Sequence, residues 1–177
     1  FMVAASRALY KAMQDEQGLT GDIAADGSTC NENNVHPDCQ PSITRTQYTA
    51  VVNDDGFGEV GSNGLAFLAP NQAFPGKSAL CRRVDTSGTQ ASSNVYFLQN
   101  PCAQFGAQTG QRVPKSVAGY GWDGTGTAPT FWTYEASGTS NVKECLSGAD
   151  LSNPANGIDG KTDAATWSIG VVSAENT

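Results

Sequence analysis

The chain has 177 residues, of which 38% are hydrophobic and 15% are charged, so we expect one folded domain with a packed core rather than a disordered chain. Its formal net charge is −7, with 10 Lys and Arg residues against 17 Asp and Glu residues, and no basic run is longer than Arg82-Arg83. This charge argues against nucleic acid and against an anionic membrane surface as partners. No apolar run approaches the roughly 20 residues that a membrane-spanning helix requires.

The first part of the chain predicts two helices separated by a polar excursion. Apolar residues four apart indicate a helix over 6–17, and the preceding FMVA fits the end of a buried strand. Residues 18–41 are rich in Gly, Asn and Asp and form an expected loop insertion. A second helix is expected over 45–53, where Thr44 and Gln47 have the spacing of a capping box.

The rest of the chain alternates expected strands with expected helices. Strands are predicted over 78–84, 129–136 and 167–173, and helices over about 88–99 and 140–147. The segments 54–77 and 100–128 are typical of long Gly-rich loops, and the last strand is expected to be buried on both faces. This order favours a single α/β lobe over residues 1–177, with a mixed or parallel sheet flanked by helices.

Five cysteines point to disulfide chemistry: Cys30, Cys39, Cys81, Cys102 and Cys145. Cys30 and Cys39 flank a short polar loop and are the easiest pair to close. Cys81 and Cys102 bracket a Ser-Gly-Thr segment, which leaves Cys145 over, although spacing alone does not fix the connectivity. Few lysines and many Ser, Thr, Asn and Gly residues fit an exported, periplasmic or extracellular protein with disulfides.

The segment RVDTSGT joins one expected strand to the next expected helix and is the strongest candidate for a binding site. A helix start exposes free N–H groups and the positive end of the helix dipole. Gly88 lets a ligand approach the backbone, and the hydroxyls of Ser87 and Thr89 add donors. Arg83 can hold an oxyanion through two parallel hydrogen bonds. Asp85 can accept a hydrogen bond from a protonated phosphate but not from a fully ionised sulfate.

The competing interpretation of this segment is an ordinary capped helix. Ser87 and Gln90 have the capping-box spacing, and Asp85 can serve as a turn residue. Arg82 and Arg83 would then make loose ion pairs at the surface.

A second Ser-Gly-Thr follows the next expected strand, at Ser137, Gly138 and Thr139. It is preceded by Glu135 rather than by an arginine, so it is a poor anion site by itself. Its expected role is to cap the helix over 140–147. An alternative is that its hydroxyls line the same cleft as the first copy, because strand ends in an open α/β sheet converge on one edge.

Other candidate sites, for a metal ion or for catalysis, have less support in the sequence. Cys30, His36 and Cys39 could ligate zinc, but a fourth ligand is missing, so a disulfide beside a solvated His36 is expected. His36 is the only histidine, and it is badly placed to serve as a base for Ser87 or Ser137 in a hydrolase. We therefore expect a binding module that is not an enzyme and uses neither a cofactor nor a metal.

The stretch LCRRVDTSGTQASSNVYFLQNPC resembles the phosphate-type periplasmic substrate-binding proteins, whose lobes are α/β and which carry an Arg, an acidic residue and Ser-Gly-Thr at this spacing. Three further stretches are similar to other elements of the second lobe of that family, namely SRALYKAMQD, PSITRTQYTAVV and WSIGVVSAEN. The similarity covers most of the chain, and residues 83–89 are its specific part. The cysteine-bearing insertions at 30–39 and around 102 depart from the family pattern.

The resemblance implies the second lobe of an exported solute-binding protein. Arg83, Ser87, Gly88 and Thr89 would hold phosphate or a similar oxyanion, and Asp85 would accept its proton. Implied partners are a missing first lobe and a membrane transporter. The rival expectation is a structural or adhesive subunit of an extracellular assembly, built from identical subunits and using the leftover Cys145.

Overall fold

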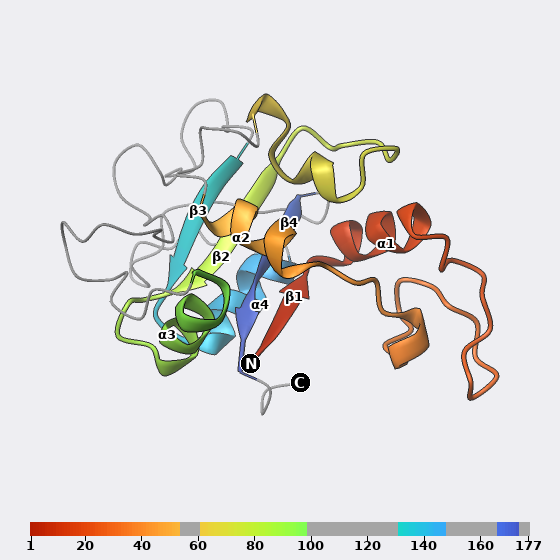
Figure 1. Cartoon of the computed structure of the whole chain (residues 1–177), viewed down its shortest axis with the longest axis horizontal. Helices are drawn as coiled ribbons and strands as arrows, with labels where there is room; N and C mark the ends of the chain where they lie inside the picture. Colours follow the sequence, from red (N-terminus) through yellow and green to blue (C-terminus); the bar gives the residue numbers. More distant parts are fainter. Residues whose placement is uncertain (54–60, 99–130, 148–165, 174–177) are drawn as a thin grey trace.

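A computed structural model describes residues 1–53, 61–98, 131–147 and 166–173 (Figure 1). Its strands are β1 (Met2–Ala5), β2 (Ser78–Arg83), β3 (Phe131–Ala136) and β4 (Trp167–Val172). Its α-helices are α1 (Arg7–Glu16), α2 (Arg45–Asn53), α3 (Gly88–Ser93) and α4 (Thr139–Ser147). The other helical segments are the 3-10 helices η1 (Pro37–Cys39) and η2 (Gly61–Leu68) and the π-helix η3 (Asn94–Leu98). The predicted α/β alternation is confirmed.

The sheet is mixed and mostly parallel, in the order β1-β4-β2-β3. The central strand β2 pairs in parallel with both β3 and β4, whereas β1 runs antiparallel to β4. β1 is therefore an edge partner of the last strand, and its residues are only partly buried rather than fully buried as expected. β4 is buried along its whole length, as predicted.

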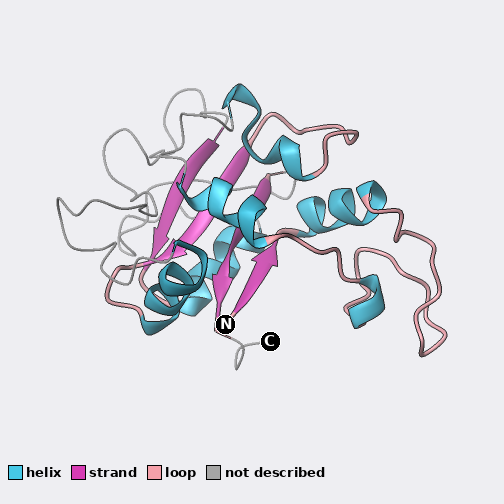
Figure 2. Cartoon of the chain, viewed as in Figure 1, coloured by secondary structure: helices cyan, strands magenta, loops and turns pink. Residues whose placement is uncertain are grey.

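Helices cover both faces of the sheet (Figure 2). Successive side chains of a strand point to opposite faces, so each strand feeds two cores. On one face Leu80 and Ile169 pack in a large cluster with residues of α1, α2 and η2. On the other face Cys81 and Tyr134 pack against α4, through a smaller cluster that includes Val142.

The structure tests the capping boxes that were predicted at the starts of α2 and α3. The capping box of α2 is confirmed, because the Thr44 N–H donates to Gln47 Oε1 over 2.9 Å and the Gln47 N–H donates to Thr44 Oγ1 over 3.1 Å. At α3, Ser87 Oγ accepts the Gln90 N–H over 3.4 Å. The second half of that predicted box is wrong, since Gln90 Oε1 accepts the Arg83 N–H over 3.0 Å instead.

Two other expectations change. The segment 54–77, expected as a loop, contains η2 between Gly61 and Leu68. The helix expected over 88–99 consists of α3 followed without a break by η3, so that residues 88–98 form one continuous helical segment. The loop expected over 100–128 lies outside the described residues.

Disulfides join Cys30 to Cys39 and Cys81 to Cys145. The first pairing is confirmed. The expectation that Cys81 would belong with Cys102 and that Cys145 would be left over is wrong. Cys81 points from the middle of β2 toward α4, where Cys145 occupies the buried face of that helix, and their Cα atoms are 6.0 Å apart. Cys102 lies outside the described residues.

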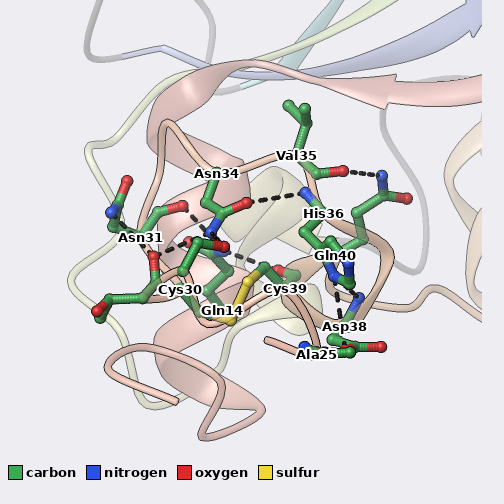
Figure 3. The surroundings of a disulfide bond; sticks show 12 residues. Gln14, Ala25, Cys30, Asn31, Asn34, Val35, His36, Asp38, Cys39 and Gln40 are labelled. Carbon is green, nitrogen blue, oxygen red and sulfur yellow. Dashed lines mark hydrogen bonds and ion pairs between the residues drawn. A yellow bond between two sulfur atoms is a disulfide. The ribbon is translucent and has the colours of Figure 1, made fainter. Parts of the chain in front are cut away.

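The excursion that carries the Cys30–Cys39 bond is attached to α1 (Figure 3). The buried side chain of Gln14 donates to the Cys39 carbonyl over 2.7 Å and to the Asn31 carbonyl over 3.2 Å. The Tyr10 hydroxyl also donates to the Cys39 carbonyl, over 3.1 Å. Both cysteines form a small cluster of their own, separate from the cores of the sheet.

Candidate functional site

The two Ser-Gly-Thr segments meet at one edge of the sheet. β2 and β3 are parallel neighbours, and their register places Arg83 opposite Ala136, the last residue of each strand. The ladder continues one step further, because the Val84 N–H donates to the Ala136 carbonyl over 3.0 Å. Parallel strands end at the same edge, so the chain leaves both strands side by side and enters α3 and α4.

Arg83 reaches across this edge to the second Ser-Gly-Thr. Its Nη1 donates to Thr139 Oγ1 over 2.8 Å and its Nη2 donates to the Ser137 carbonyl over 3.2 Å. Its Nε is buried and has no hydrogen-bond partner within the described residues. Among the described residues, the acceptors that bind the guanidinium are neutral, and they do not compensate its charge.

Arg82 lies on the opposite face of the same strand, and its side chain is only 1% exposed. Its guanidinium forms an ion pair with Asp85 and a second one with Glu135, whose Oε2 lies 3.5 Å from Nη1. Its Nε also donates to the Arg83 carbonyl over 2.8 Å. Buried arginines are rare unless they are paired, and the described residues alone give this one two ion pairs.

Sequence reasoning missed the role of Arg82, which appeared only in the competing interpretation, as a surface residue. The signal was the alternation of the strand: two adjacent arginines must point to opposite faces. The pairing also bears on Asp85. Its carboxylate already compensates a buried guanidinium, which argues against its expected role as acceptor of a ligand's proton.

The first Ser-Gly-Thr is mostly occupied with the helix start. Ser87 is buried, and its hydroxyl caps α3. Gly88 is exposed, and the place where a Cβ would stand has no atom within 4 Å, so the backbone is open to a ligand. Thr89 is partly buried. In the described part of the chain, no hydrogen bond joins Arg83 to these three residues.

The second Ser-Gly-Thr makes different contacts from those expected. The hydroxyl of Ser137 donates to Asn141 Oδ1 over 3.1 Å, and the first helical hydrogen bond runs from the Val142 N–H to the Gly138 carbonyl, over 3.3 Å. Because Thr139 Oγ1 accepts from Arg83, its own O–H remains available to donate. The parallel pairing of β2 and β3 brings both copies to one edge of the sheet, and the shared cleft of their hydroxyls stays a prediction.

The zinc hypothesis gains no support from the geometry. Cys30 and Cys39 are bonded to each other, and His36 Nδ1 accepts the Asp38 N–H over 3.2 Å at the start of η1. Within the described ranges, no group of three or more His, Cys, Asp or Glu side chains could hold a metal ion.

Comparisons with protein-family models, with curated proteins and with solved structures give no match for this chain. The resemblance to phosphate-type binding proteins therefore rests on the residues of the chain alone.

Proposed function

We propose that the edge formed by the ends of β2 and β3 binds a small oxyanion such as phosphate, and that the chain is one lobe of an exported solute-binding protein. The observation that supports this most is Arg83, whose guanidinium lies at the start of α4, where the described residues hold it through neutral acceptors. An oxyanion offers it a better acceptor than a threonine hydroxyl, because an oxyanion also compensates the charge of the guanidinium and can accept two parallel N–H···O bonds from it.

In the proposed complex each neighbouring group has a defined role. Arg83 supplies the charge and a planar pair of donors. Thr139 turns its free O–H toward the anion, and the exposed backbone at Gly88 allows close approach at the start of α3. Arg82 does not touch the ligand in this proposal. It neutralises Asp85 and Glu135, so that these carboxylates repel the anion less.

The pairing of Asp85 has a consequence for selectivity. Discrimination of phosphate from sulfate requires an acceptor for the proton that phosphate carries and sulfate lacks. With Asp85 bound to Arg82, we expect this lobe alone to bind the two anions with similar affinity. Stronger and more selective binding would require the first lobe, since half a cleft buries half a ligand.

The test is a titration of the chain with phosphate and with sulfate, followed by amide NMR. The amides of Gly88 and Thr139 are expected to shift with saturation. Arg83→Gln should weaken phosphate binding at least tenfold, which corresponds to about 1.4 kcal/mol. Arg45→Gln, an exposed arginine at the start of α2, is the matched control and should bind normally. Unchanged binding by Arg83→Gln would overturn the proposal.

Localisation and partners remain part of the same proposal. The two disulfides fit an oxidising compartment such as the periplasm or the extracellular space. No helix among the described residues is long and apolar enough to cross a membrane. The adhesive alternative relied on a free Cys145 for linking subunits, and the Cys81–Cys145 bond removes that support.

A further inference from the structure

The main chain of Arg83 is bound by two buried side chains. Its N–H donates to Gln90 Oε1 over 3.0 Å, and its carbonyl accepts the Nε–H of Arg82 over 2.8 Å. Gln90 is 2% exposed and Arg82 is 1% exposed. Both main-chain polar groups of Arg83 therefore have partners that are themselves fixed by burial.

The contact with Gln90 lies where the sheet stops pairing on one side of β2. β4 pairs with β2 only as far as Cys81, whereas β3 pairs with it as far as Arg83. The Val84 N–H points toward β3, where it donates to the Ala136 carbonyl. Successive N–H groups of a strand point to opposite sides, so the Arg83 N–H points to the side where β4 no longer pairs. Gln90 supplies there the acceptor that a neighbouring strand would otherwise supply.

Gln90 is itself held in one orientation. Its Nε2 donates to Asn94 Oδ1 over 2.9 Å, and Asn94 is 3% exposed. Its N–H donates to Ser87 Oγ over 3.4 Å. Because the Arg83 N–H can only donate, the amide oxygen of Gln90 must face it, which leaves the amide nitrogen for Asn94. The side chain of Gln90 is thus a fixed link between the end of β2 and α3.

The position of the Arg83 guanidinium depends on this link. Arg83 is the last residue of β2, and a strand end that is paired on one side only frays more readily. The side chain must reach from this strand end to the Ser137 carbonyl at 3.2 Å and to Thr139 Oγ1 at 2.8 Å. A rotation of the main chain at Arg83 would carry the guanidinium away from both acceptors.

We propose that Gln90 is a positioning residue for Arg83 and thereby sets the affinity of the sheet edge for an oxyanion. This inference rests on the oxyanion site proposed above. Gln90 does not touch the ligand: its side chain fixes the main chain of Arg83, and Arg83 carries the charge. A neutral amide suits this position, because a carboxylate here would place a negative charge close to the anion.

Gln90→Met tests the link, because it keeps the length of the side chain and removes both of its hydrogen bonds. Isothermal titration calorimetry is expected to show phosphate binding weakened about threefold or more. Thr44→Ala is the matched control, since it also removes a helix-capping hydrogen bond, on α2, and should bind phosphate normally. Unchanged binding in Gln90→Met, or equal weakening in both variants, would overturn the proposal.

NMR of the chain without phosphate tests the position of Arg83 directly. In the unmodified chain the Arg83 amide should exchange slowly with solvent, and its buried Nε–H should give a sharp signal. Gln90→Met should broaden that Nε–H signal or shift it toward the value of a mobile arginine, and Thr44→Ala should leave it unchanged. Fast exchange of the Arg83 amide in the unmodified chain, or an unchanged Nε–H signal in Gln90→Met, would refute the positioning role.

These readings separate the positioning role from the proposed function. They need no anion, so they report on Gln90 and Arg83 even where phosphate fails to bind. The exchange rate is measured on the unmodified chain, so it decides the question even where Gln90→Met does not fold. Absence of phosphate binding together with a slowly exchanging Arg83 amide would therefore overturn the oxyanion site and leave the link between β2 and α3 standing.

Discussion

Removing each disulfide in turn tests the topology, because the two bonds close loops of very different length. Cys81 and Cys145 are 64 residues apart, whereas Cys30 and Cys39 are 9 residues apart. In the chain-entropy treatment of cross-links, a loop of 64 residues contributes about 4.3 kcal/mol to stability at 25 °C and a loop of 9 contributes about 2.6 kcal/mol. All four cysteines are buried, so the loss of packing is similar in both pairs.

The double variants Cys81→Ala/Cys145→Ala and Cys30→Ala/Cys39→Ala are therefore compared by urea unfolding. We expect the first to lose roughly 1.7 kcal/mol more stability than the second. Five cysteines with two bonded pairs also leave one free thiol, which a thiol reagent should count in the denatured, unreduced chain. A larger loss from the 30–39 variant, or a labelled Cys145, would refute the assigned pairing.

Three further outcomes are expected. Gly170→Ala should lower stability by about 3 kcal/mol or more in urea unfolding, because a Cβ there would stand 2.1 Å from the Cys81 carbonyl oxygen, a backbone atom that cannot move aside. Thr44→Ala should lower it by about 1 kcal/mol through loss of the α2 cap. Burial raises the pKa of Tyr48 and of Tyr134 far above the ordinary value of 10, so both should resist ionisation in an absorbance titration until the chain unfolds.

The sign of the tyrosine effect follows from the folded state holding its protons more tightly than the unfolded state. The contribution of these two protonated tyrosines to the free energy of unfolding is complete below about pH 10 and is lost as the pH rises further. Tyr48→Phe should remove one of the two tyrosines that ionise late.

For the Thr44→Ala prediction, Thr46→Ala at an exposed position of α2 is the control and should have little effect on stability. For Gly170, Gly88→Ala is the comparison, since its Cβ would meet open space.

Local features of the fold were accessible from the sequence, whereas long-range pairings were not. The spacing of apolar residues located α1 and α2, and apolar runs located β2 and β4, because these signals lie within a few neighbouring residues. The Cys81–Cys145 bond depends on α4 returning across the sheet, which residue spacing does not reveal.

In the candidate site, too, local features could be predicted from the sequence, whereas long-range contacts could not. The prediction that Arg83 belongs to a binding site followed from its place between a strand and a helix start, but its contact with Thr139, 56 residues away, follows from the parallel register of β2 and β3. The pairing of Asp85 with Arg82 was missed because the two arginines were not assigned to opposite faces. A ligand was expected to use Asp85, and the ion pair now makes that role a question for the phosphate and sulfate titration.

The attachment of the excursion to α1 leaves its amino-acid sequence open to change. Gln14 and Tyr10 donate to main-chain carbonyls of the loop rather than to its side chains, so these particular contacts do not depend on which residues the loop displays. Val35 is 77% exposed inside the loop that the disulfide closes, and Ile23 is 66% exposed in the part of the excursion that precedes this loop. Such a segment can diversify in evolution, or carry a grafted epitope in the laboratory, while the sheet and its helices keep their structure.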